Sequence, residues 1–159
     1  MSRYKNNRKS QQIKKVGLNL SKDLAAEFST MALRCKFNFS YLDSNQDGAA
    51  DFNHFSKLEL KSLILKIKDF SKESLEQWKL DGSYKNYGKF PSKTNFKHPS
   101  FVPEEVLWGR FRLQGKFRLA GFTVSTEIAK NHDDLDTNTF YVVFLDINHN
   151  FYLSKKKHT

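Results

Sequence analysis

The stretch that decides the fold reads Arg110-Phe111-Arg112-Leu113-Gln114-Gly115-Lys116-Phe117-Arg118-Leu119. Basic and apolar residues alternate on both sides of a glycine, and this period of two is typical of β-strands joined by a tight turn. We therefore predict a β-hairpin with one apolar face and one cationic face. A cationic face of this kind favours a phosphate-rich partner.

The register of this hairpin follows from its apolar face. A two-residue loop, 114–115, would place Phe111 opposite Arg118 and mix charged with apolar side chains on each face. A three-residue loop, 114–116, places Phe111 opposite Leu119 instead. Because a slip of one residue turns every side chain over, we expect the three-residue loop. The arginines that then share one face are Arg110, Arg112 and Arg118.

The positive charge of the chain is unevenly distributed. Two tails, residues 1–15 and 155–159, hold nine of the ten net positive charges. Between them, residues 79–122 carry a net charge of +6 and residues 127–146 a net charge of −4. The hairpin is therefore a cationic site of its own. Both basic tails are polar, and we expect the N-terminal one to be disordered, serving either as a solvated tail or as an arm that attracts nucleic acid.

Between the tails, residues 16–154 are expected to form a single α+β domain, and the 15 Phe, 6 Tyr and 2 Trp supply its core. The predicted order is an N-terminal helix, one strand, a helical pair and an antiparallel sheet of three to five strands. The strand at 140–145 is apolar on both faces and should be central. The predicted helices are 22–33, 55–68 and a short one after Asp69, and the predicted strands are 35–42, 84–90, the two arms of the hairpin, 140–145 and 151–153.

The cysteine content and the hydropathy pattern indicate a cellular location. Cys35 is the single cysteine, which fits a reducing compartment. No apolar run reaches the length of a spanning helix, and the N-terminus has no apolar segment typical of a signal peptide. We therefore expect a cytoplasmic protein with no membrane partner.

One acidic loop is similar to a metal site. Residues 43–51 match the first nine positions of a calcium-binding loop, but His54 occupies the position of the essential glutamate and a strand precedes the loop. An Asx-rich turn explains these residues better. We expect no metal and no cofactor.

The arginines and one histidine are the candidate functional residues. Arginine suits phosphate because its planar group binds two oxygens at once, and a protein without an anionic partner gains little by concentrating like charges. The alternative is a solvated sheet face neutralised by Glu104, Glu105 or the acidic residues near Asp133. His149, in the turn after the final apolar strand, can act as a general acid or base or hold a phosphate; alternatively, it only caps the turn.

The stretch 107–122, followed by 140–152, resembles the RelE/ParE superfamily of bacterial toxins, and the similarity covers residues 35–153. This resemblance implies a helical hairpin packed against an antiparallel sheet. It also implies either ribosome-dependent mRNA cleavage or inhibition of gyrase, with RNA or the ribosome as a partner and an antitoxin as a second one.

The resemblance also implies roles for individual residues. Arg112 and Arg118 would hold RNA phosphates, Lys116 would assist in charge stabilisation, and His149 or Tyr152 would transfer protons. Cleavage by the 2′-hydroxyl needs positioning, proton transfer and stabilisation of the phosphorane charge, so a site without metal is sufficient. The catalytic candidates are therefore His149, Tyr152 and Arg118, and the nucleic-acid-binding candidates are Arg110, Arg112, Lys116 and Arg118.

Two other interpretations are open. In the first, the same cationic face belongs to a non-catalytic binding protein or inhibitor of a phage, plasmid or defence system, and it binds nucleic acid or an acidic protein. In the second, the acidic residues 133–136 contact the arginine face of a second copy, which gives a homodimer without nucleic acid.

Overall fold

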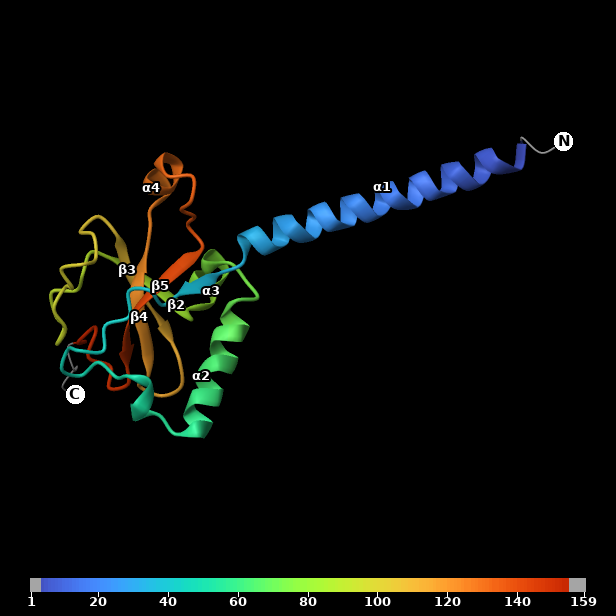
Figure 1. The fold of residues 1–159 in the computed structure, drawn as a ribbon. Helices are drawn as coiled ribbons and strands as arrows, with labels where there is room; N and C mark the ends of the chain where they lie inside the picture. The colour runs from blue at the N-terminus through green and yellow to red at the C-terminus, as the bar shows by residue number, and fades with distance from the viewer. Residues whose placement is uncertain (1–3, 155–159) are drawn as a thin grey trace. The chain divides into compact units, whose positions relative to one another are not determined.

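The computed structural model describes residues 4–154, and for residues 4–8 and 18–20 it describes the backbone alone. It confirms the α+β class, with helices and a single five-stranded sheet (Figure 1). The elements are the helices α1 (Tyr4–Leu33), α2 (Lys57–Phe70), α3 (Leu75–Asp81) and α4 (Thr126–Asn131), the 3₁₀ helix η1 (Phe52–His54), and the strands β1 (Lys36–Asn38), β2 (Tyr84–Gly88), β3 (Leu107–Arg112), β4 (Arg118–Thr123) and β5 (Thr139–Asp146).

Helix α1 corrects the prediction for the N-terminal region. The chain divides into two compact units, one ending at Leu33 and the other beginning at Arg34. Residues 4–15, expected to be disordered, are helical, and they continue into the helix predicted at 22–33. Residues 4–16 contain no glycine or proline and are rich in Lys, Arg and Gln, which favour helix, so propensity outweighs the like-charge repulsion. The compact unit that holds the sheet begins at Arg34. The tail at 155–159 lies outside the described residues.

The sheet is mixed, with the strand order β1-β5-β4-β3-β2. Four strands are antiparallel to their neighbours, as predicted, but β1 pairs with β5 in parallel. The predicted strand 35–42 is shorter than expected because a turn that Leu42 closes on Phe39 (N–H to carbonyl, 3.1 Å) follows it. Strand β5 has a partner on each side, which confirms that the strand predicted at 140–145 is central.

The hairpin has the predicted three-residue loop. The N–H of Leu113 donates to the carbonyl of Phe117 (3.0 Å), and Gly115 adopts φ +59° at the tip. Phe111 lies opposite Leu119, and Arg112 lies opposite Arg118. The register argument from the apolar face is therefore confirmed.

Both faces of the sheet carry an apolar core. Helices α2 and α3 cover one face, where Phe111 and Leu119 lie in the core. The long segment 89–106 and the turn after β5 cover the other face, around Trp108 and Phe144. The predicted cationic face is therefore cationic only at the hairpin end. Its other half is apolar, because residues of the long segment insert into it: Phe96, Val102 and Val106 are buried.

The last segment forms part of this cover. Residues 151–153, predicted as a strand, form no regular strand. Leu153 donates its N–H to the carbonyl of Lys93 (2.8 Å), and Asn95 donates to the carbonyl of Asn150 (3.0 Å). These bonds hold the C-terminal segment against the segment 89–106. Across residues 4–154, no helix is long and apolar enough to cross a membrane.

The burial of Cys35 predicts a loss of stability in alkali. The thiol is buried beneath the helices, and burial raises its pKa from 9.0 to about 12. Above its ordinary pKa the thiol ionises in the unfolded chain and stays protonated in the folded one. The free energy of unfolding should therefore fall between pH 9.0 and about 12, by about 1.4 kcal/mol per pH unit at most. Urea unfolding at a series of pH values measures it.

Cys35→Ala is the control for this effect. Burial also raises the pKa of Tyr84, from 10.0 to about 12, so its contribution begins about one pH unit higher. In the alanine variant, the decrease in the free energy of unfolding that begins at the ordinary pKa of the thiol should be absent. The decrease due to Tyr84 should remain. An unchanged pH profile in Cys35→Ala would contradict the assignment.

Candidate nucleic-acid interface

The three arginines share one face of the sheet, as predicted, at the hairpin end. Arg112, Arg118 and Asp146 lie directly opposite one another across β3, β4 and β5. Arg110 lies two residues before Arg112, and Lys85 of β2 is its partner. Lys85 was missed, because pairing between β2 and β3 is a long-range contact that no local pattern indicates.

Arg110 is the most buried of these cations, with 8% of its surface exposed. Its Nε and Nη1 are buried and have no hydrogen-bond partner. A buried charged donor without a partner is costly, so the structure keeps a guanidinium group with donors free to bind an anion.

Arg118 stabilises the hairpin loop and also has a hydrogen-bond donor without a partner. Its Nη1 donates to the carbonyl oxygens of Gly115 (2.7 Å) and Phe117 (2.8 Å), which fixes the hairpin loop. Its Nε is buried without a partner. Burial lowers the pKa of Arg118, and the neighbouring charges of Arg110 and Arg112 lower it further. This mutual repulsion makes a bound anion favourable at this place.

Asp146 is the residue that sequence reasoning missed at the centre of the site. It is fully buried at the end of β5. The backbone N–H groups of Asn150 and Phe151 donate to its two carboxylate oxygens, each at 2.8 Å. The carboxylate therefore both fixes the turn that carries His149 and offsets one positive charge. The sequence feature that could have indicated Asp146 is its position as an acidic residue at the end of an apolar strand.

The three catalytic candidates come together. His149 lies at φ +59° in the turn, a left-handed conformation uncommon for a non-glycine residue. The ring of Tyr152 stacks on that of Tyr87, with centroids 4.6 Å apart and planes 3° from parallel. We call the place where these side chains meet the arginine crevice; it is lined by Tyr87, Arg110, Arg118, Asp146, His149, Phe151 and Tyr152.

The arginine crevice is narrow. Its space, open solvent included, is about 170 Å³, and no water-sized sphere fits inside it. Tyr152 is the most exposed of the side chains that line it, at 39%. A phosphate group can therefore reach the guanidinium groups only if side chains of the crevice move, while Arg112 and Lys85 are exposed beside it.

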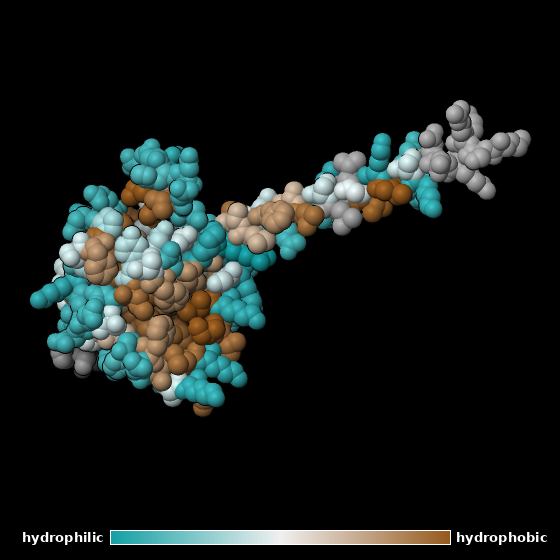
Figure 2. Space-filling model, viewed as in Figure 1, coloured by the Kyte–Doolittle hydropathy of each residue, from teal (hydrophilic) through white to brown (hydrophobic). Residues whose placement is uncertain are grey.

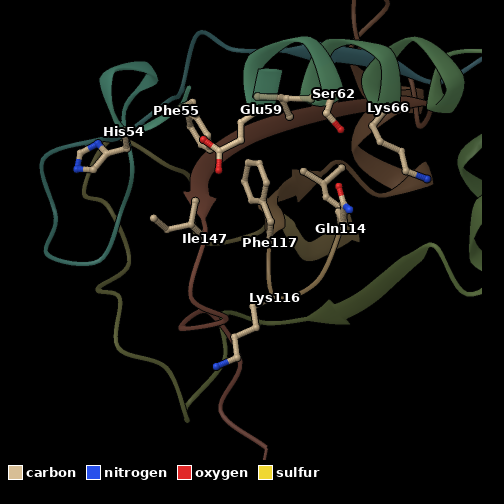
Figure 3. A pocket seen from close by; sticks show the side chains of 11 residues that line it. His54, Phe55, Glu59, Ser62, Lys66, Gln114, Lys116, Phe117 and Ile147 are labelled. Atoms are coloured by element: carbon tan, nitrogen blue, oxygen red, sulfur yellow. The ribbon is translucent and has the colours of Figure 1, made fainter. Parts of the chain in front are cut away.

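Lys116 is not part of this site. It lines a pocket of about 420 Å³ on the other side of the hairpin, between the hairpin tip, η1 and α2. Figure 3 shows Lys116 pointing away from Phe117, whose ring stacks on Phe55 with centroids 5.2 Å apart. Lys116 is separated from the arginines because it lies in the three-residue loop, where side chains no longer alternate between the two faces of the sheet. The structure therefore places Lys116 apart from the residues that line the arginine crevice.

In the acidic loop at 43–51, a carboxylate accepts hydrogen bonds from other residues of the same loop. The carboxylate of Asp43 accepts from the N–H of Asn45 (2.9 Å) and from Nε2 of Gln46 (3.1 Å), as an Asx turn does. In residues 4–154, no group of three or more His, Cys, Asp or Glu side chains is placed to hold a metal ion.

Comparison of the chain with protein families, with curated proteins and with solved structures gave no match.

Proposed function

We propose that the protein binds RNA in the cytoplasm and that the arginine crevice holds a backbone phosphate. The observation that carries this proposal is Arg110, a buried guanidinium group with two unpartnered nitrogen atoms, beside Arg118, whose Nε is also buried without a partner. A phosphate oxygen accepts from such donors and restores the hydrogen bonds that burial removed.

The charge around the crevice supports the same proposal. Four cations, namely Lys85, Arg110, Arg112 and Arg118, lie on neighbouring strands, and Asp146 offsets one of them. The exposed cations at the margin attract a polyanion, and the buried ones bind one of its phosphates. The stacked tyrosines offer a ring on which an unpaired base can stack.

The test is the affinity for a fluorescein-labelled single-stranded RNA, measured by fluorescence anisotropy at two salt concentrations. Lys85→Gln combined with Arg112→Gln removes two exposed cations at the crevice and leaves its buried residues intact. We expect the affinity to fall about tenfold or more and the salt dependence to become shallower, because fewer counterions are released.

The matched control is Lys116→Gln, which removes one charge from the same hairpin outside the crevice. We expect a fall of no more than about twofold. A second control, Lys14→Gln with Lys15→Gln, removes two charges from α1. If either control weakens binding as much as the crevice variant, the crevice is not the RNA site; wild-type protein that binds no RNA at low salt would refute the proposal entirely.

A second candidate function is metal-free RNA cleavage, favoured because His149 and Tyr152 line the same crevice as the arginines. His149 would accept the proton of a 2′-hydroxyl, whose oxygen attacks the adjacent phosphorus. Tyr152 would donate a proton to the leaving 5′-oxygen, and the arginines would stabilise the phosphorane. The products are a 2′,3′-cyclic phosphate and a free 5′-hydroxyl. This is the chemistry that the resemblance to the RelE/ParE toxins implies, with the ribosome and an antitoxin as partners.

Two conservative variants separate cleavage from binding. His149→Gln and Tyr152→Phe should leave RNA affinity within about twofold and lower the cleavage rate by about a hundredfold or more. Cleavage is followed on gels in the presence of EDTA, with and without ribosomes, and growth arrest on expression is scored in parallel. Equal cleavage by both variants and wild type would exclude these residues, and RNA binding without cleavage would leave the non-catalytic binding protein as the function.

A further inference from the structure

A second cavity lies away from the arginine crevice, between α4 and the sheet. Its volume is about 410 Å³, within the range of small-molecule sites. We call it the tyrosine pocket. The residues that matter for its chemistry are Tyr41, Glu105, Phe122, Ile128, Leu135 and Tyr141.

The wall of the tyrosine pocket is aromatic. The ring of Phe122 lies parallel to Tyr141, with centroids 4.8 Å apart and planes 11° from parallel. Tyr41 meets both rings edge-on, at 5.1 Å and 5.7 Å. These mutual contacts fix the rings, so the wall exists before a ligand arrives. Ile128 and Leu135 supply apolar surface opposite, and the space therefore suits a flat, apolar body.

One acidic side chain lines the pocket, and two more lie between lining residues in the sequence. Glu105 lines it, and the exposed pair Asp133 and Asp134 lies between the lining residues His132 and Leu135. We call these three carboxylates the acidic rim. In Figure 2 hydrophilic residues cover α4, and hydrophobic residues lie directly beneath it.

The neighbouring charged residues carry both signs. Asp136 is engaged by Lys36, with Nζ and Oδ2 3.2 Å apart, so its charge is largely offset. Glu127 and Lys130 of α4 are both exposed and carry opposite charges, so they add no net charge. The excess negative charge comes from Glu105, Asp133 and Asp134. An anion is repelled at this entrance and a cation is attracted.

We infer that the tyrosine pocket binds a small molecule with a flat aromatic body and a protonated amine. The body packs on the aromatic wall, and the amine lies at the acidic rim. This ligand class differs in charge from the one proposed for the arginine crevice, and no residue lines both sites.

The test uses three probes that share an indole ring, namely tryptamine, which is cationic, 3-methylindole, which is neutral, and indole-3-acetate, which is anionic. Titration of the full chain is followed by amide chemical shifts in NMR. We expect tryptamine to bind about fivefold or more tighter than indole-3-acetate at low salt, with 3-methylindole between them, and the difference to shrink in high salt.

Three variants complete the test. Ile128→Trp fills the pocket and should abolish binding of all three probes, whereas Ile64→Trp, the same change at an exposed position on α2, should leave binding unchanged. Asp133→Asn with Asp134→Asn should reduce the preference for the cation about twofold or more and leave 3-methylindole unaffected. The inference is overturned if no probe binds, if the anion binds as tightly as the cation at low salt, or if Ile128→Trp binds as well as wild type.

Discussion

Gly121→Ala is expected to prevent stable folding. Gly121 lies in β4 where the pairing with β5 shifts register, and a Cβ at this position would overlap the carbonyl oxygen of Tyr141. The ring of Phe140 closes the same space. Because both obstacles belong to the central strand, relief requires β4 and β5 to separate. We expect a loss of about 4 kcal/mol or more, which is comparable to the stability of an entire domain.

Circular dichroism and urea unfolding measure this effect, and the chain offers a matched control. At Gly17, in α1, a Cβ would meet nothing within 4 Å. Gly17→Ala should therefore raise the helix content slightly, since alanine favours helix by about 1 kcal/mol over glycine. A Gly121→Ala protein that unfolds cooperatively at the wild-type urea concentration would show that the register shift has been placed wrongly.

Asp146→Asn is the second substitution with a large expected effect. It removes the buried negative charge opposite Arg118 and weakens the bonds from the N–H groups of Asn150 and Phe151. We expect the free energy of unfolding to fall by about 2 to 4 kcal/mol, because the buried guanidinium groups lose their compensation. The measurement is urea unfolding at low salt.

Added sulfate tests the reason for that loss. If uncompensated arginines cause it, an anion bound at the crevice should stabilise Asp146→Asn more than wild type. The control is Asp136→Asn, which removes an exposed carboxylate that pairs with Lys36, and it should cost less than about 1 kcal/mol and show no added response to sulfate. Equal behaviour of the two variants would contradict the assigned role of Asp146.

The sequence pattern was sufficient to predict an element where the spacing of apolar residues matched a single type of secondary structure. The alternation from Arg110 to Leu119 predicted the hairpin, its three-residue loop and the face shared by the arginines. The helix predicted at 55–68 is α2, displaced by two residues. Ser56 caps it, since the N–H of Glu59 donates to its hydroxyl and the Glu59 side chain accepts from its N–H. In both cases the determining residues are neighbours in the sequence.

The remaining features depend on contacts between distant residues. The face of the sheet that carries the arginines was expected to be cationic, but segment 89–106 covers its apolar half. The sequence does not indicate which face of a sheet a long loop will cover, because that depends on tertiary packing. Lys85 and Tyr87 reach the crevice through pairing of β2 with β3, and His149 reaches it because Asp146 fixes the turn. The parallel contact of β1 with β5 joins residues about a hundred positions apart.

The position of β5 also determines when this domain can fold. Strand β5 lies between β1 and β4, yet among the strands of residues 4–154 it is the last to be synthesised. Until it leaves the ribosome, β1 has no partner in the sheet, and the contacting rings of Phe37 and Phe111 lack Phe140, which packs against both. Folding of the sheet is therefore expected to wait until β5 has left the ribosome, and nascent chains that end before residue 139 should be open to proteases.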